Sequence, residues 1–301
     1  MSSAGFSVII PCYNAGKYVY KIISDLINQT FKEFEVIFIN DNSKDNTLEI
    51  INEVCTIDSR FKVIKNEVNL GPNCSRENGL RAAKKDFVLF VDADDRIANT
   101  YLEEFAKKAS NKDIVVCDYS IIKDMNDERK IVETTSIESD LTFYIKEMIL
   151  THKTNSLWAK CFRRALFDDI ALNTPYRVGE DLLTCVEAFK KARSIETINK
   201  TLYFYLLRED SMMGNKTYRT DVIDVINLLL EKYPDLEKEL SLRKMLEYRR
   251  VYYLLDEDEK KVAEEFFKSF KYKKNLSFKE KTFLKWHKNK IFQSFLKRHY
   301  E

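Results

Sequence analysis

The sequence predicts an α/β fold with a mostly parallel sheet flanked by helices, followed by a helical C-terminal region. Over the first 125 residues, short apolar runs rich in β-branched and aromatic residues alternate with helical patterns, which is typical of βαβ units. Polar clusters directly follow four of these runs. From about Asp221 onward the pattern is helical, without a recognisable domain motif.

Five apolar runs form the strands of the predicted sheet. Between the first two runs, Val19, Ile22 and Leu26 recur on one side of a helix. After the second run, Ser43 or Asp45 can cap a second helix. The predicted strands are Phe6–Pro11, Phe34–Ile39, Phe61–Lys65, Phe87–Val91 and Asp113–Asp118.

Each of the first four predicted strands is followed by a polar cluster. In chain order the clusters read PCYN, NDNSKDN, NLGPNCSREN and DADD. Asn-Asp-Asn-Ser and Gly-Pro are also good turn sequences, so each cluster alone could be a simple turn. The carboxyl ends of parallel strands share one edge of a sheet, and ligands bind there. The coincidence at four strand ends therefore predicts one ligand-binding crevice.

The DADD cluster places Asp92, Asp94 and Asp95 at the end of an apolar run. Ionised carboxylates this close repel one another and are costly to desolvate, unless a cation is shared among them. The chain has no GxGxxG after its first strand and no GxxxxGK[ST], so these two glycine-rich phosphate loops are excluded. An Asp-x-Asp can instead bind Mn²⁺ or Mg²⁺ together with a diphosphate, which is the predicted cofactor arrangement.

The composition is typical of a globular protein that remains in the cytoplasm. Hydrophobic residues make up 45% and charged residues 33%, unlike a disordered chain. Six cysteines occur singly, which indicates reduced thiols, and the three histidines lack metal-ligand spacing. No apolar run approaches the roughly 18 residues that span a bilayer. The N-terminus MSSAGFSVII lacks the basic start of a signal peptide.

The ordered series of motifs resembles family 2 glycosyltransferases of the GT-A fold, which are inverting enzymes that use nucleotide-sugar donors. The series is SVIIPCYNAGKYV, SDLINQTFKEFEVIFINDNSKDNT, NLGPNCSRENGL, FVLFVDADD and GEDLLT, within residues 5–215. The resemblance implies that Pro11, Tyr13, Asn14 and Asp41 bind the nucleotide. It also implies that Asp92 and Asp94 or Asp95 hold ribose and metal, with Asp94 and Asp95 as the predicted metal ligands.

Chemistry agrees with these roles. Asp41 can accept a hydrogen bond from a uracil imide or a ribose, and Tyr13 offers a ring to the base. Arg76 is suited to bidentate contacts with the diphosphate. The alternative for Arg76 is a solvated charge on the helix after the third strand.

The second half of the chain contributes the candidate base and acceptor residues. Trp158 is either a platform for a sugar ring or a core residue among apolar neighbours. A displacement at an anomeric carbon needs a base for the attacking hydroxyl, and the resemblance implies Asp181, supported by Glu180. Two acids in a first helical turn also favour the helix dipole, which is the simpler explanation. The segment YFYLLREDSMM resembles one that closes over the diphosphate, which implies roles for Arg208 and Ser211.

We expect a catalytic domain over residues 1–217, with a nucleotide-binding half to about residue 120 and an acceptor half from about 121 to 217. Residues 218–301 form the predicted helical, basic C-terminal region. Residues 268–301 carry ten Lys and one Arg against two Glu, a net charge of +9. A basic amphipathic helix with Trp and Phe suits peripheral contact with an anionic membrane, here at the inner face of the cell membrane. Packing on the catalytic domain is the alternative; no nucleic-acid recognition motif is present.

The leading hypothesis is a metal-assisted hexosyl- or N-acetylhexosaminyl-transferase. It would move a sugar from a nucleoside diphosphate, with UDP the expected one, to a saccharide or lipid-linked saccharide during bacterial-type polysaccharide or glycolipid assembly. One alternative is a non-catalytic scaffold, which the clustered acids argue against. The other is a nucleotidyltransferase, whose Gly- and Arg-rich opening loop is missing after the first strand.

Overall fold

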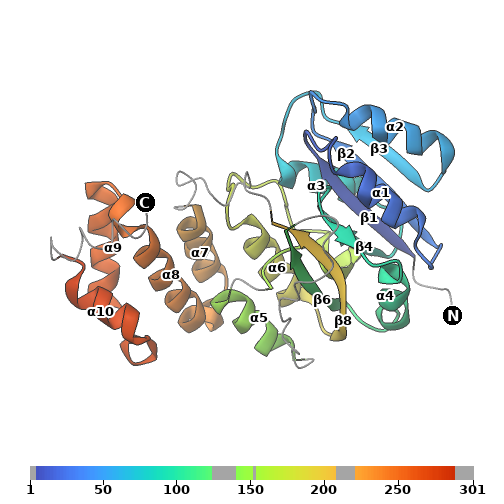
Figure 1. Cartoon of the computed structure of the whole chain (residues 1–301). Helices are drawn as coiled ribbons and strands as arrows, with labels where there is room; N and C mark the ends of the chain where they lie inside the picture. Colours follow the sequence, from blue (N-terminus) through green and yellow to red (C-terminus); the bar gives the residue numbers. More distant parts are fainter. Residues whose placement is uncertain (1–4, 124–139, 152–153, 208–220, 289–301) are drawn as a thin grey trace. The chain divides into compact units, whose positions relative to one another are not determined.

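A computed structural model describes residues 5–123, 140–151, 154–207 and 221–288 (Figure 1). The chain forms two compact units, which are described separately. The first unit comprises Met1–Ile145, Lys153–Pro175 and Thr184–Gly214. The second unit comprises Lys146–His152, Tyr176–Leu183 and Asn215–Glu301.

The first unit is built on one sheet with the strand order β3-β2-β1-β4-β7-β6-β8-β5. Strands β3, β2, β1 and β4 pair in parallel, as do β6 and β8, whereas β7 and β5 pair antiparallel with their neighbours. The predicted mostly parallel α/β sheet is therefore confirmed. Its strands are β1 Phe6–Cys12, β2 Phe34–Asn40, β3 Phe61–Lys65, β4 Phe87–Phe90, β5 Arg96–Ile97, β6 Ile114–Ile122, β7 Lys160–Arg163 and β8 Ile195–Leu206.

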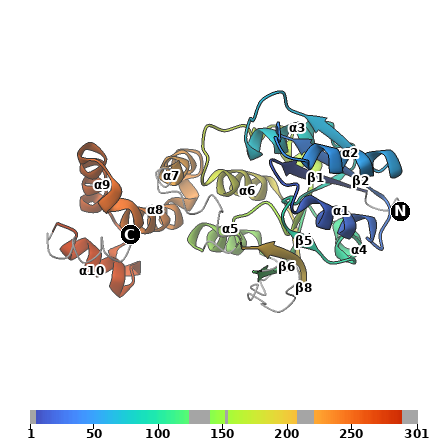
Figure 2. The ribbon, with the colours of Figure 1, turned by 45° about the horizontal axis from the view of Figure 1, so that its top comes forward.

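Helices cover both faces of the parallel half of the sheet. Helices α1 (Val19–Ile27) and α2 (Thr47–Ile57) lie side by side in Figures 1 and 2 and share one core with alternate residues of β1 and β2. Helix α3 (Pro72–Ala82) packs on β1 and β2 through Gly79. A Cβ at Gly79 would lie 2.4 Å from Ile9 Cγ2, so only glycine allows this close approach.

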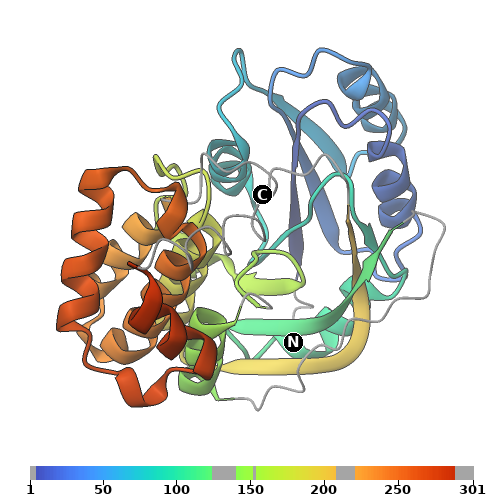
Figure 3. The ribbon, with the colours of Figure 1, turned by 60° about the vertical axis from the view of Figure 1, so that its left-hand side comes forward.

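The other half of the sheet is irregular. Strands β6 and β8 pair in parallel, with register shifts on either side of Asp118. Figure 3 shows β8 bending alongside β6. Helix α4 (Tyr101–Ala109) packs against this pair. The remaining helices that carry residues of the first unit are α5 Leu141–Leu150, η1 Arg164–Phe167 and α6 Glu180–Lys191.

The second unit is helical, as predicted for the C-terminal region. Its core gathers aromatic residues such as Tyr248, Tyr252, Phe267 and Phe283. No helix within the described ranges is long and apolar enough to span a bilayer. Its elements beyond residue 220 are α7 Asp221–Lys232, η4 Pro234–Leu236, α8 Glu237–Val251, η5 Tyr252–Leu254, α9 Glu257–Ser269, η6 Lys273–Asn275 and α10 Phe278–Trp286.

Candidate active site

The three acids after β4 have different environments. Asp92 and Asp94 are partly exposed, whereas Asp95 is fully buried at 0% exposure. Burial, followed by the charges of Asp94 and Asp92, raises the pKa of Asp95 well above its usual value. The acids are therefore divided into an accessible pair and one buried carboxyl group.

Asp95 joins the end of β4 to the end of β8. Its Oδ2 accepts a hydrogen bond from Tyr203 Oη at 2.5 Å, and its Oδ1 accepts one from the Leu206 amide at 2.7 Å. Tyr203 Oη also accepts a hydrogen bond from the Asp92 amide at 3.2 Å. With both oxygens engaged and no exposed surface, Asp95 does not fit the predicted metal-ligand role. It fits a positioning residue instead.

Asp92 is held by an arginine of helix α3. Arg76 on α3 donates from Nη2 to Asp92 Oδ1 at 3.1 Å and from Nη1 to Asn73 Oδ1 at 3.4 Å. Its residue exposure is 5%, so the alternative of a solvated helix charge is wrong. The pair places a buried guanidinium directly beside the accessible acids, where a second anionic group could share it.

Asp41, at the end of β2, organises the loop before α3. Its Oδ1 accepts hydrogen bonds from Asn66 Nδ2 and the Leu70 amide, both at 2.8 Å. Its Oδ2 accepts one from the Gly71 amide at 2.8 Å. Gly71 has a φ of 87°, in the region that favours glycine, and Pro72 then begins α3. This 3%-exposed carboxylate thus shapes the loop through charge-assisted hydrogen bonds.

The loops after β1 and β2 are bound to each other through Asn14. Asn14 has a φ of 48°, and its amide donates to Ser43 Oγ at 3.1 Å. Its Oδ1 accepts from the Lys44 amide at 2.9 Å. Asn14 is thereby engaged in the loop, while Tyr13 beside it is 52% exposed. Pro11 lies within β1, in register with Ile39.

The carboxyl ends of β1, β2 and β4 converge. After burial, the negative charges of Asp94, Asp92 and Asp45 raise the pKa of the buried Cys12 thiol. These acids come from the segments that follow β4 and β2, and Cys12 ends β1. Because β1 pairs in parallel with both β2 and β4, the polar segments that follow these three strands lie along one edge of the sheet, as predicted.

With this geometry established, comparison with known proteins identifies the chain. The sequence profile of glycosyl transferase family 2 matches residues 7–192. The chain belongs to glycosyl transferase family 2. Its α/β sheet matches the GT-A fold of a solved structure, residues 1–349 of Staphylococcus aureus TarS in complex with UDP-GlcNAc. That match has a TM-score of 0.66 and 27% identity, and it covers 82% of this chain and 72% of the TarS chain.

Two sequence relatives of this family 2 chain show how much of each protein is similar. EpsH of Bacillus subtilis (strain 168) is 30% identical over 222 residues, which is 71% of this chain and 64% of EpsH. The chain thus spans less than two thirds of that relative. The GalNAc(5)-diNAcBac-PP-undecaprenol beta-1,3-glucosyltransferase of Campylobacter jejuni is 27% identical over 246 residues, covering 81% of this chain and 78% of the relative.

Trp158 of this family 2 protein belongs to an aromatic stack. Its ring is stacked on Tyr203 at 4.9 Å and on Tyr205 at 5.4 Å, and it meets Tyr119 edge-on at 4.7 Å. The side chain is only partly buried against the core. The expectation of a core residue is therefore met in part, because Trp158 packs on the core, whereas its role as a sugar platform stays a prediction.

Glu180 and Asp181 lie in the second unit, as the first residues of α6. Gly179 precedes them with a φ of 90°, and its carbonyl accepts a hydrogen bond from the Leu183 amide at 3.0 Å. Both acids are partly exposed. Their assignment as base and supporting acid for a family 2 reaction stays a prediction.

Arg208 and Ser211 lie outside the described residues. The structure does describe how the segment before them is held, because Asp95 binds the Leu206 amide at the end of β8. No sequence pattern indicates this contact, because the two residues are 111 positions apart.

The residue types after β4 fit a divalent ion. Asp92 and Asp94 offer hard oxygen donors on partly exposed side chains. Among the described residues, no three His, Cys, Asp or Glu side chains form a group that could hold a metal ion alone. Mg²⁺ commonly takes one or two carboxylates and completes its shell with water and substrate phosphates. The accessible pair matches that donor set.

Proposed function

We propose that this family 2 protein transfers a hexosyl or N-acetylhexosaminyl group from a nucleoside-diphosphate sugar to an acceptor hydroxyl, with inversion. The observation that carries the proposal is the accessible Asp92–Asp94 pair beside buried Arg76, at the edge where β1, β2 and β4 end. In this proposal the two acids bind a cation and the neighbouring arginine contacts an anion. A metal-bound diphosphate has both charges.

The donor is proposed to be UDP-linked. Tyr13 exposes a ring that can stack on the base. Asp41 is buried with both oxygens engaged, so it would support the nucleotide by shaping the neighbouring loop. Pro11, within β1, and Asn14, which joins the loops after β1 and β2, are proposed to support this site. The TarS structure in complex with UDP-GlcNAc, similar over most of this chain, supports the choice of UDP.

Mn²⁺ or Mg²⁺ is the proposed cofactor. Asp94 is the proposed ligand, with Asp92 beside it, because both are accessible while Asp95 is enclosed by Tyr203 and Leu206. When bound, the ion would neutralise charge on the diphosphate. Arg76 would contact a phosphate oxygen and Asp92, and Asp95 would fix the backbone that carries Asp94.

Asp181 is proposed as the general base, with Glu180 in support. A carboxylate near the attacking hydroxyl can take its proton as the diphosphate leaves, and such a base typically contributes about 10² to 10⁴ in rate. Arg208 and Ser211 are proposed to contact the diphosphate. Trp158 is proposed to face the sugar with its partly exposed ring.

The acceptor is proposed to be a saccharide or lipid-linked saccharide in polysaccharide or glycolipid assembly. The named activity of the Campylobacter jejuni relative, on an undecaprenol-linked saccharide, supports this choice. A cytoplasmic protein in peripheral contact with the inner face of the membrane, through residues 268–301, is the proposed setting. Its basic charge supports that contact.

Calorimetric titration with UDP, with and without Mn²⁺, tests the proposal. We expect Mn²⁺-dependent binding that Asp94→Asn abolishes. Asp168→Asn is the matched control, because Asp168 is exposed and does not follow the carboxyl end of β4. It follows β7 and η1, and the last residue of β7 pairs with Phe87 at the amino end of β4. Loss of UDP binding in both variants, or binding that ignores Mn²⁺ and Asp94, would contradict the proposed site.

A further inference from the structure

The second unit contains a cationic cavity that the transfer reaction does not use. It has a volume of about 420 Å³ and lies among α9, η6 and α10. Phe267, Leu276 and Leu284 provide its apolar lining. Five lysines and one glutamate also line it, a net formal charge of +4: Lys268, Lys273, Lys281, Lys285, Lys288 and Glu264.

Most of this positive charge is not neutralised by the protein. Lys288 pairs with Glu264 at 2.6 Å. Lys268, Lys273 and Lys281 form no ion pair with any residue in the described parts of the chain, and all three are exposed. Like charges gathered around one cavity repel one another, so an anion there would relieve the repulsion. The cavity thus favours a negatively charged ligand.

The apolar features distinguish between anionic ligands. Two buried side chains, Phe267 and Leu276, each 6% exposed, lie behind the lysines. On α10, Phe278 precedes Lys281 and Lys285 by three and seven positions, so the three share one helical face. Phe278 is 83% exposed. A large apolar side chain beside exposed lysines suits a bilayer surface, where the ring enters the lipid and the ammonium groups meet phosphates.

We propose that this cavity binds the phosphate headgroup of an anionic lipid, with Phe278 inserted beside it. Lys268, Lys273, Lys281 and Lys285 surround the phosphate, and Phe267 and Leu276 contact the adjoining apolar part. The site is defined by a cavity rather than by the overall charge of the C-terminal region. It does not depend on the proposed transfer reaction, because it uses none of the residues assigned to donor or base.

Vesicle sedimentation of the full chain tests the site. Phosphatidylcholine vesicles with and without phosphatidylglycerol provide the comparison, and binding is expected only with phosphatidylglycerol and to weaken with added salt. The double variant Lys281→Gln/Lys285→Gln is expected to lose about 30-fold in partition, since each lysine at an anionic surface contributes about fivefold. Phe278→Ala is expected to reduce partition while leaving thermal unfolding unchanged, because Phe278 is exposed.

The matched control is Lys274→Gln/Lys279→Gln. It removes the same number of charges, one from η6 and one from α10, at exposed positions that do not line the cavity. Its partition is expected to change less than fivefold. An equal loss in both double variants would show diffuse attraction and overturn the site. Titration with glycerol 3-phosphate distinguishes a lipid headgroup from a soluble phosphate ester as the ligand. Tight binding of glycerol 3-phosphate without vesicle binding would overturn the lipid proposal in favour of a soluble phosphate ester. Binding to duplex DNA in place of vesicles would also overturn the proposal.

Discussion

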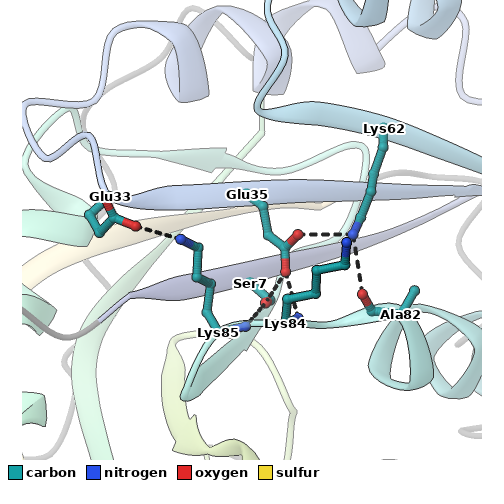
Figure 4. Close-up of polar contacts among 7 residues, drawn as sticks. All are labelled: Ser7, Glu33, Glu35, Lys62, Ala82, Lys84 and Lys85. Carbon is teal, nitrogen blue, oxygen red and sulfur yellow. Dashed lines mark hydrogen bonds and ion pairs between the residues drawn. The ribbon is translucent and has the colours of Figure 1, made fainter.

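Glu35→Gln is a sharp test of how the amino edge of the sheet is held. Glu35 Oε1 accepts hydrogen bonds from Ser7 Oγ at 2.6 Å and the Lys84 amide at 2.7 Å (Figure 4). Its Oε2 accepts from Lys62 Nζ at 2.9 Å. One carboxylate therefore ties β1, β2 and β3 to the segment before β4. Nearby, Glu33 pairs with Lys85 in a more exposed setting.

The magnitude follows from which contact the amide cannot keep. Glutamine can still accept from Ser7 and the Lys84 amide through its oxygen, but its NH₂ group faces the Lys62 ammonium. One charge-assisted hydrogen bond is lost, worth about 1.5–3 kcal/mol. The Lys62 side chain is 35% exposed and regains some solvation, so we expect a loss of about 1–2 kcal/mol in the free energy of unfolding.

The effect depends on pH in a defined direction. Burial alone would raise the pKa of Glu35, but hydrogen bonds from Ser7, Lys62 and the Lys84 amide outweigh it and hold that pKa below its ordinary value. The stabilisation is therefore present above the unfolded pKa, about 4.3, and is lost as the pH falls through the folded pKa. The gap between wild type and Glu35→Gln is expected to be constant near neutrality and to close in acid.

Urea unfolding followed by circular dichroism, at neutral and acidic pH, measures this gap. Glu33→Gln is the control, because its side chain is 55% exposed and such pairs contribute about 0–1 kcal/mol. The two units can unfold in separate steps, so the transition of the first unit is the one to compare. Equal losses for the two variants, or a Glu35→Gln gap that persists in acid, would refute the reasoning.

Three further predictions concern the site and its support. Gly79→Ala is expected to lower the free energy of unfolding by about 1–3 kcal/mol, because the new Cβ meets Ile9 Cγ2 at 2.4 Å; unchanged thermal unfolding would contradict this. Asp41→Asn is expected to destabilise the protein by about 1–3 kcal/mol, since an NH₂ group replaces an acceptor for a loop amide such as that of Gly71. Asp41→Asn is also expected to weaken UDP binding, and calorimetric titration together with a thermal melting curve distinguishes weaker binding from lower stability. Asp181→Asn is expected to spare UDP binding and reduce sugar transfer about 10²- to 10⁴-fold; full turnover would remove Asp181 from the base role.

The parallel strands could be predicted because strands buried on both faces are continuous apolar runs. The predicted Phe61–Lys65 has the observed bounds, and the runs from Phe6, Phe34 and Phe87 differ only at their ends. The position of the polar segments at the carboxyl edge of the sheet followed from the parallel topology alone. For this reason the convergence of Asp41, Arg76 and the acids after β4 was accessible from the sequence.

The antiparallel part of the sheet was not predicted. Strand β7 has four residues, Lys160–Arg163, and charged residues at both ends hide it from any apolar pattern. Lys160 is nevertheless 2% exposed, and its ammonium donates to the Ser156 carbonyl at 2.6 Å. Such burial depends on a local contact that hydrophobic periodicity does not register.

The difference in burial between Asp95 and its neighbours Asp92 and Asp94 could not be predicted from the sequence either. Three acids within four residues look alike in a motif, and the distinction comes from Tyr203, 108 positions away from Asp95. The structural role of Asp41 likewise depends on Asn66 and the Leu70 amide, which no spacing rule connects to it. Long-range hydrogen bonds of this kind decide which carboxylate remains available to a ligand.

The position of β7 has a consequence for truncated and nascent chains. Strand β4 obtains its second neighbour only from residues 160–163, after β6 has already been synthesised. A fragment that ends near residue 120 would present the backbone groups of β4 along an open, apolar margin, and such margins recruit other chains. The nucleotide-binding half is thus expected to aggregate when expressed alone, and during translation it would depend on chaperones until β7 leaves the ribosome.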